Sequence, residues 1–186
     1  MGIGGGEMKA AVPGRRAVFL DRDGVINKAI VREGKPYPPA DLTELEIPPR
    51  VREALAQLKA AGFILIVVSN QPDVARGTTR RSTVEAINSA LGKTLPIDEF
   101  VICCHDSGDG CHCRKPQPGM LLDSAEKWAI DLPASFMVGD RWRDVEAGQR
   151  AGCKTVFIDY GYDERQPDNV DCRVGALIEA IPFICR

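Results

Sequence analysis

The sequence predicts an α/β fold, a Rossmann-like three-layer sandwich with a central parallel sheet. Short apolar runs rich in Val, Ile, Leu and Phe alternate with segments of helical period, an order typical of parallel strands joined by crossover helices. Clusters of polar residues directly follow several of the apolar runs. Because ligands bind beyond the carboxyl ends of the strands in open parallel sheets, we expect these clusters to meet at one edge of the sheet.

The apolar runs give the positions of the strands. Continuous apolar stretches without polar alternation are typical of strands that are buried on both faces, as in a parallel sheet. Five strands are expected, at residues 17–20, 63–68, 100–103, 135–138 and 155–158.

The helices are predicted from the spacing of apolar residues and from their end signals. In residues 49–61 apolar side chains three or four positions apart share one face, and Gly62 is suited to end that helix. Ser82 and Glu85 form a capping-box pattern, which predicts that the second helix begins there. The remaining helices are expected at residues 118–129, 145–151 and 174–184.

Composition limits the class of protein. The chain has 186 residues, of which 44% are hydrophobic, so it can bury a single core. Its longest apolar run, 63–68, is far shorter than the roughly 20 residues of a membrane span, and its start lacks a signal-peptide pattern. The 24 basic and 26 acidic residues nearly balance, which gives no support to a nucleic-acid partner.

We therefore expect a cytoplasmic monomer that binds neither membrane nor nucleic acid. Residues 1–16 are expected to form a flexible N-terminal segment, and residues 17–186 a single domain, because no linker long enough to divide the chain is present.

Cysteine and histidine are concentrated in one short segment. The chain has seven cysteines and two histidines, and four of the cysteines and both histidines lie in residues 103–113. Cys103 and His105, followed by Cys111 and Cys113, supply three thiolates and one imidazole, a set suited to tetrahedral Zn²⁺. Four protein ligands leave no open position on the metal, so we expect a structural zinc site.

Two further residues of this segment leave the ligand set open. Cys104 adjoins His105, and His112 lies between Cys111 and Cys113, so either could replace a proposed ligand. A reduced or redox-active cysteine cluster without metal is the alternative interpretation of the segment.

Acidic residues follow the first and fourth expected strands. Asp21 and Asp23 lie two positions apart, so an extended backbone places both carboxylates on the same side. Asp140 and Asp144 add oxygen atoms from another strand end. Carboxylates gathered in this way need a countercharge, and Mg²⁺ is the cation usually bound by such oxygen ligands.

Hydrogen-bond donors follow the second and third expected strands. Ser69 offers a hydroxyl and Asn70 an amide, and Lys115 offers a compact positive charge. Together with a cation they could surround a phosphoryl group, whose transfer depends on positioning and on neutralising its oxygens.

The residues of these strand ends resemble the four motifs of the haloacid dehalogenase superfamily of phosphohydrolases. The matching segments, in the correct order, are 19–27 (FLDRDGVIN), 68–71 (VSNQ), 113–116 (CRKP) and 138–141 (VGDR). They are similar in particular to the group of heptose 1,7-bisphosphate phosphatases and histidinol-phosphate phosphatases, which has no large cap domain and has a zinc loop directly before its Arg-Lys-Pro motif. Residues 28–39 match this group least.

The resemblance implies a role for each motif residue. Asp21 would be the nucleophile that forms an aspartyl-phosphate, Asp23 the general acid and base, and Ser69 and Lys115 the groups that hold the phosphoryl oxygens. Substrate contacts are implied for Arg22, Asn70, Gln71, Arg114 and Arg141. Mg²⁺ would be held by Asp21, Asp140 and the backbone carbonyl of Asp23, with Asp144 as a support behind them.

The expected activity is Mg²⁺-dependent hydrolysis of a small phosphorylated metabolite. A heptose 1,7-bisphosphate 7-phosphatase in carbohydrate metabolism, on the route to a lipopolysaccharide core precursor, is the activity that the resemblance implies first. Histidinol phosphate is an alternative substrate, and a non-catalytic, zinc-stabilised binding module is an alternative class. A receiver-type signalling domain is disfavoured, because there the lysine follows the last of the strand-end acids, whereas here Lys115 precedes Asp140.

Overall fold

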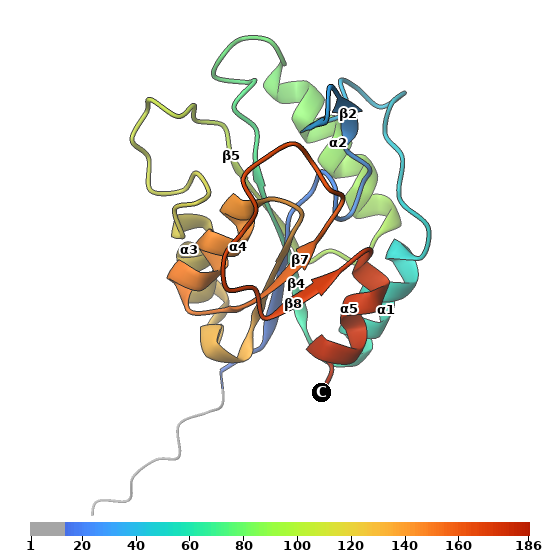
Figure 1. The fold of residues 1–186 in the computed structure, drawn as a ribbon, viewed down its shortest axis with the longest axis vertical. Helices are drawn as coiled ribbons and strands as arrows, with labels where there is room; N and C mark the ends of the chain where they lie inside the picture. Colours follow the sequence, from blue (N-terminus) through green and yellow to red (C-terminus); the bar gives the residue numbers. More distant parts are fainter. Residues whose placement is uncertain (1–13) are drawn as a thin grey trace, which may run out of the picture.

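A six-stranded parallel sheet with helices on both faces forms the protein (Figure 1), which we describe from a computed structural model covering residues 14–186. The strand order is β5-β4-β1-β6-β7-β8. The strands are β1 (Ala17–Leu20), β4 (Ile64–Asn70), β5 (Glu99–Cys103), β6 (Phe136–Gly139), β7 (Lys154–Ile158) and β8 (Cys172–Val174). The three-layer α/β sandwich predicted from the sequence is confirmed, and the five expected strands lie where the apolar runs are.

The helices form the two outer layers. They are α1 (Val51–Ala60), α2 (Arg81–Thr94), α3 (Gly119–Trp128), α4 (Trp142–Ala151) and α5 (Leu177–Ile184), with a short 3₁₀ helix at Leu132–Ala134. One core packs α1, α2 and α5 on one face of the sheet, and a second core packs α3 and α4 on the other. Helices α1 and α5 pack side by side (Figure 1).

Strand β8 is a correction to the prediction of a helix over residues 174–184. Its three residues pair in parallel with β7, Val156 opposite Cys172, and α5 begins only at Leu177. A three-residue strand that includes an arginine has too short an apolar pattern to be recognised alone. Pairing with the neighbouring strand is what makes it extended.

The predicted capping box at Ser82 and Glu85 is also wrong. Helix α2 begins at Arg81, Arg80 is its N-cap residue, and no side chain caps it. Glu85 is instead paired with Arg81, one turn away on the exposed surface of the helix, with 2.9 Å between Arg81 Nε and Glu85 Oε1. A local charge pair therefore takes the carboxylate that the capping pattern assigned to the backbone.

Between β1 and α1 the chain forms a short hairpin and no large cap domain within the described residues. Strands β2 (Ile30–Arg32) and β3 (Lys35–Tyr37) pair antiparallel around a turn at Glu33 and Gly34, both with positive φ. Two consecutive residues with positive φ are typical of the tight hairpin turn that suits strand twist. This hairpin occupies the segment 28–39 that matched the known motifs least.

The N-terminal segment is only partly described. Residues 1–13 of the expected flexible segment 1–16 lie outside the described residues. Arg15 forms an isolated parallel bridge with Ile130, and the Arg16 guanidinium donates a hydrogen bond to the Ala61 carbonyl. Among residues 14–186, no helix combines the length and the apolar character needed to cross a membrane.

Gly148 allows α4 to approach the sheet closely. A Cβ atom at this position would lie 2.6 Å from Met137 Cβ and 3.0 Å from Thr155 Cγ2, on strands β6 and β7. Gly148→Val is therefore expected to lower the free energy of unfolding by about 2 kcal/mol, because it overpacks this contact. Urea unfolding followed by circular dichroism measures the change. Gly108→Val, at an exposed glycine with open space around it, is the control, and an equal loss in both variants would contradict the packing argument.

Candidate active site

The polar clusters predicted to meet at one edge of the sheet line a common cavity of about 300 Å³. It lies at the carboxyl ends of β1, β4 and β6, the strands at the centre of the sheet. The expected residues that line it are Asp21, Asp23, Ser69, Asn70, Arg114, Lys115, Arg141 and Asp144. Residues from three strand ends and from the loop before α3 are thus brought together by parallel strand order.

Lys115 connects the parts of the cavity floor. Its ammonium nitrogen lies 2.8 Å from Asp21 Oδ1 and 2.7 Å from Asp144 Oδ1, and it donates a third bond of 2.8 Å to the Val68 carbonyl. The side chain is only 3% exposed. Because all three hydrogens of the ammonium group have acceptors, the position of this charge is fixed.

The charges of these buried side chains shift one another's pKa values. Burial raises the pKa of Asp21 to about 6, against the opposing charge of Lys115. Burial acts to lower the pKa of Lys115, but the charges of Asp144 and Asp21 outweigh it and the pKa is raised. The lysine therefore stays protonated while it holds the two carboxylates.

The buried carboxylate of Asp140 shows that this site suits a cation. Both of its carboxylate oxygens are buried, and neither has a partner with hydrogen-bond geometry among residues 14–186. One oxygen each from Asp21, Asp140 and Asp144 lies within 4.8 Å of the others. Burial, together with the charges of Asp21 and Asp144, raises the pKa of Asp140 well above its usual range. Buried carboxylates short of partners and positive charge fit Mg²⁺, which takes oxygen ligands.

Gly24 is required for the approach of Asp140. The glycine has a φ of +97°, and a Cβ atom there would lie 1.9 Å from Asp140 Oδ2. The Asp-Arg-Asp-Gly sequence therefore ends in glycine for two reasons, the left-handed backbone and the closeness of the carboxylate.

Asp23 is held by side chains from two strand ends. Asn27 Nδ2 donates to its Oδ1 at 3.0 Å and Gln71 Nε2 to its Oδ2 at 2.8 Å. The same Gln71 nitrogen lies 2.9 Å from Ser69 Oγ, so the hydroxyl accepts there and its own hydrogen stays free to donate. Gln71 is 3% exposed and does not line the cavity, so its place differs from the predicted substrate contact.

Arg22 also differs from the prediction of a substrate contact. Its side chain is fully buried, with two bonds of 3.1 Å from its Nη2 to the Asp23 carboxylate and one of 3.1 Å from its Nη1 to Asn88 Oδ1 on α2. The guanidinium points into the core, where it orients Asp23. Sequence alone could not show this direction, because the partner amide lies 66 residues away.

The three remaining predicted contacts, Asn70, Arg114 and Arg141, lie at the cavity wall. Asn70 forms two hydrogen bonds with the backbone of Lys115, one of 2.9 Å to its carbonyl and one of 3.0 Å from its amide. Arg114 donates to the carbonyl of His105 at 3.1 Å. Asn70 therefore fixes the loop that carries Lys115, besides facing the cavity.

Five charged residues of the cavity escaped the sequence analysis: Lys35, Asp73, Arg76, Arg143 and Glu164. Glu164, in the loop after β7, forms an ion pair with Arg141, and Arg76 and Arg143 also line the cavity. Burial and the positive charges of Arg141 and Arg114 lower the pKa of Arg143. None of these residues belongs to a recognisable motif. The spacing in Arg141-Trp142-Arg143 is the one local signal that could have drawn attention to Arg143.

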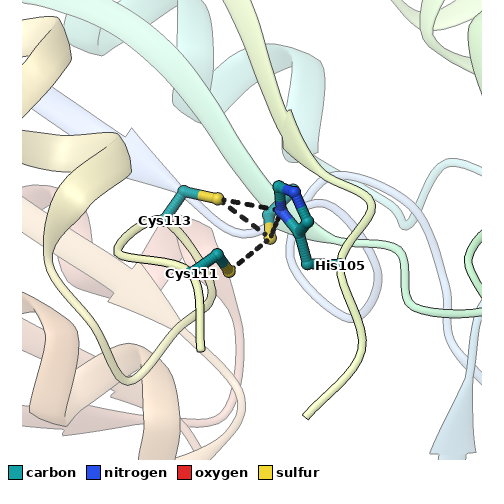
Figure 2. A group of neighbouring side chains, drawn as sticks. His105, Cys111 and Cys113 are labelled. Atoms are coloured by element: carbon teal, nitrogen blue, oxygen red, sulfur yellow. Dashed lines mark hydrogen bonds between the residues drawn. The ribbon is translucent and has the colours of Figure 1, made fainter. Parts of the chain in front are cut away.

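Three of the proposed zinc ligands, His105, Cys111 and Cys113, come together in the loop between β5 and α3 (Figure 2), and the fourth, Cys103, is the last residue of β5. Cys113 Sγ lies 3.2 Å from Cys103 Sγ and 3.3 Å from His105 Nδ1, and Cys103 and Cys111 sulfur atoms are 3.8 Å apart. One ligand atom from each of the four residues lies within 4.8 Å of the others. Tetrahedral zinc separates its sulfur and nitrogen ligand atoms by roughly 3.5–3.8 Å. The distance between the Cys103 and Cys111 sulfur atoms matches this spacing, and the two distances from Cys113 are shorter by up to about half an ångström.

The two alternative ligands lie outside this group. His112 is largely exposed, and its Nε2 is paired with Asp123 Oδ2 at 3.0 Å. Cys104 is likewise not among the four residues that could hold an ion together. The geometry therefore favours the set Cys103, His105, Cys111 and Cys113.

Comparison with known proteins gives a consistent set of relatives. A family model described as HAD-hydrolase-like matches residues 112–176. The chain is 37% identical over 157 residues to a D-glycero-β-D-manno-heptose-1,7-bisphosphate 7-phosphatase of Rhodopseudomonas palustris, covering 78% of this chain and 84% of the relative. It is 35% identical over 163 residues to the enzyme of the same name from Escherichia coli, covering 81% of each.

Solved structures agree with the sequence relatives. A crystal structure of D,D-heptose 1,7-bisphosphate phosphatase from Bordetella bronchiseptica, complexed with magnesium and phosphate, superposes with a TM-score of 0.77 at 29% identity, covering 91% of this chain and 97% of that chain. The corresponding enzyme from Burkholderia thailandensis superposes with a TM-score of 0.60 at 25% identity, covering 92% of this chain and 100% of that chain.

Because Arg22 is buried and paired within the core, we expect its replacement to lower stability rather than to weaken substrate binding. Arg22→Met leaves Asp23 and Asn88 without their buried partner, so we expect the free energy of unfolding to fall by about 3 kcal/mol. Urea unfolding measures this loss, and KM for substrate should stay close to that of the wild type. Arg81→Met, which removes an exposed ion pair on the same helix as Asn88, should cost less than about 0.5 kcal/mol. Unchanged stability together with a raised KM for Arg22→Met would instead support the sequence prediction that Arg22 contacts the substrate.

Proposed function

Because the chain belongs to the D-glycero-β-D-manno-heptose-1,7-bisphosphate 7-phosphatase family of HAD-type hydrolases, we propose that it removes the 7-phosphate of a heptose 1,7-bisphosphate. The chain is a phosphatase, and the relative solved with magnesium and phosphate supports Mg²⁺ as its cofactor. The observation that carries the assignment of roles is the buried group of charges at the cavity floor. Lys115 is paired there with Asp21 and Asp144, and the buried carboxylate of Asp140 lies beside these two acids.

The first half of the reaction uses Asp21 as nucleophile. A carboxylate oxygen of Asp21 attacks phosphorus, the bond from phosphorus to the sugar oxygen breaks, and an aspartyl-phosphate forms. Asp23 gives a proton to the leaving sugar oxygen. The hydrogen bonds from Asn27 and Gln71 support this role, because they fix the carboxyl group beside the cavity.

The second half returns the enzyme to its starting state. Asp23 takes a proton from a water molecule as the water oxygen attacks phosphorus, and the bond to Asp21 breaks to release inorganic phosphate. In both halves the Ser69 hydroxyl donates a hydrogen bond to a phosphoryl oxygen, and the Lys115 ammonium, held by its own acceptors, supplies positive charge beside the phosphoryl group. Gln71 supports the donation by Ser69, since it occupies the acceptor side of that hydroxyl.

Asp21, Asp140 and the backbone carbonyl of Asp23 are the groups that would hold Mg²⁺. Mg²⁺ when bound supplies positive charge that neutralises the carboxylates and the phosphoryl oxygens. Asp144 is assigned a supporting role, because its Oδ1 accepts from Lys115 and its Oδ2 accepts from the Arg141 amide at 3.0 Å.

The loop between β5 and α3 is proposed to hold a structural zinc ion. Residues 104–118 contain no helix or strand, so the loop has few backbone hydrogen bonds to fix it. Zn²⁺ bound by Cys103, His105, Cys111 and Cys113 would cross-link the loop and thereby position Arg114 and Lys115, which follow the last ligand directly.

Four further proposals, on the domain, the oligomeric state, the location and the pathway, rest on the sequence alone. We propose a single phosphatase domain over residues 17–186, a monomer, a cytoplasmic location and a place in lipopolysaccharide core precursor synthesis. Substrate contacts by Asn70, Arg114 and Arg141 are proposed from their places at the cavity wall.

The nucleophile assignment predicts that Asp21→Asn lowers kcat by about 10⁴-fold or more, because the amide cannot form the acyl-phosphate. The assay measures phosphate release from heptose 1,7-bisphosphate, with histidinol phosphate as the competing substrate. Asp168→Asn, at an exposed carboxylate remote from the cavity, should retain full activity.

EDTA should abolish wild-type activity and excess Mg²⁺ should restore it. Activity of Asp21→Asn close to that of the wild type would refute the mechanism.

The zinc proposal predicts one zinc per chain by elemental analysis of purified protein. Cys111→Ser removes one thiolate and should lower both the zinc content and the thermal midpoint of unfolding by several degrees. Cys185→Ser, at an exposed cysteine far along the chain, should change neither. Well-folded wild-type protein without zinc would refute the structural role.

A further inference from the structure

The outer part of the cavity carries more positive charge than its acidic residues neutralise. The arginines that line it are Arg76, Arg114, Arg141 and Arg143. Two of them have acidic partners. Arg141 is paired with Glu164, and Arg76 with Asp106, with 2.7 Å between Arg76 Nη2 and Asp106 Oδ1. The other two have no comparable partner within the described chain.

Arg143 is the less satisfied of those two. Its Nε is buried and has no hydrogen-bond partner in the part of the chain that the structure describes. Glu164 Oε1 lies 4.0 Å from its Nη2, beyond hydrogen-bond reach, and the same oxygen is already paired with Arg141. Arg114 reaches only a backbone carbonyl, that of His105. Arg143 therefore lines the cavity without a hydrogen-bonded acceptor of its own among the described residues.

The position of Arg143 is restrained although its guanidinium has no hydrogen-bonded acceptor within residues 14–186. Its guanidinium carbon lies 5.3 Å from the centre of the Trp142 ring, within the range of a cation–π contact. Arg143 also lines both the active-site cavity and an adjoining hollow that contains Arg114 and Trp142. It therefore lies where a substrate that extends outward from the reacting phosphoryl group passes.

We propose that Arg143 binds the second phosphate of the substrate, the one that is not hydrolysed, and so makes the enzyme prefer bisphosphorylated sugars over monophosphorylated ones. The planar guanidinium presents a pair of donors that matches two phosphate oxygens. A phosphate there supplies acceptors for the partly exposed guanidinium, whose side chain is 29% exposed, and the negative charge that the outer cavity lacks. This inference rests on the proposed function and adds a specificity-determining residue to it.

The test compares two substrates that differ only in the second phosphate. For wild type, Arg143→Gln and Arg165→Gln, kcat/KM is measured on heptose 1,7-bisphosphate and on the same heptose carrying the 7-phosphate alone. Arg165 is the matched control, because its guanidinium also lies over Trp142, at 4.7 Å, but is more than half exposed and does not line the cavity.

Arg143→Gln should lower kcat/KM for the bisphosphate about 10- to 100-fold, mainly through KM, and change the value for the monophosphate less than threefold. Arg165→Gln should leave both values near those of the wild type. Equal losses on the two substrates, or no loss on the bisphosphate, overturn the role of Arg143 while the proposed function stands. Wild-type protein that hydrolyses neither sugar phosphate overturns the proposed function itself.

Discussion

The ammonium group of Lys115, held between the carboxylates of Asp21 and Asp144, is the interaction on which the site depends. Taking charged groups out of water is costly, and the cost is offset only when each charge has close partners and filled hydrogen bonds. Here one lysine joins the end of β1, the first turn of α4 and, through the Val68 carbonyl, strand β4. The same contacts that make the buried charge tolerable therefore fix the relative positions of the nucleophile and its surroundings.

Charge is distributed in two zones along the cavity. The floor holds three carboxylates against one lysine, so it has an excess of negative charge that a divalent cation can neutralise. The wall holds arginines in excess of acids, which suits an anionic substrate. In the proposed function, the reacting phosphate would lie toward the floor and the rest of the sugar toward the wall. The near-neutral net charge of −2 is compatible with this, because the attraction is local rather than spread over the whole surface.

The two metal sites proposed for this chain use opposite kinds of ligands. Carboxylate oxygens at the strand ends suit Mg²⁺, whereas three sulfur atoms and an imidazole suit Zn²⁺, so neither metal competes well for the other site. Their structural contexts also differ. The carboxylates lie at or just beyond the strand ends, whereas of the sulfur ligands only Cys103 ends a strand, and Cys111 and Cys113 lie in a loop without helix or strand. A cross-link is most useful in such a loop, since it replaces the missing backbone hydrogen bonds beside Arg114 and Lys115.

The sequence by itself determined the sandwich, the strand ends that carry acids, and the gathering of Cys103, His105, Cys111 and Cys113. These features depend on local patterns, since apolar runs, residue spacing and motif order lie within short stretches of chain. Only the tertiary structure decided where Arg22 points, that β8 is a strand, and that Arg143 has no hydrogen-bonded acceptor among residues 14–186. Each of these depends on residues distant in the sequence: Asn88 for Arg22, β7 for β8, and Glu164 already engaged by Arg141 for Arg143. Local pattern thus sets which residues can act, and packing between distant segments sets the direction and the partners of each side chain.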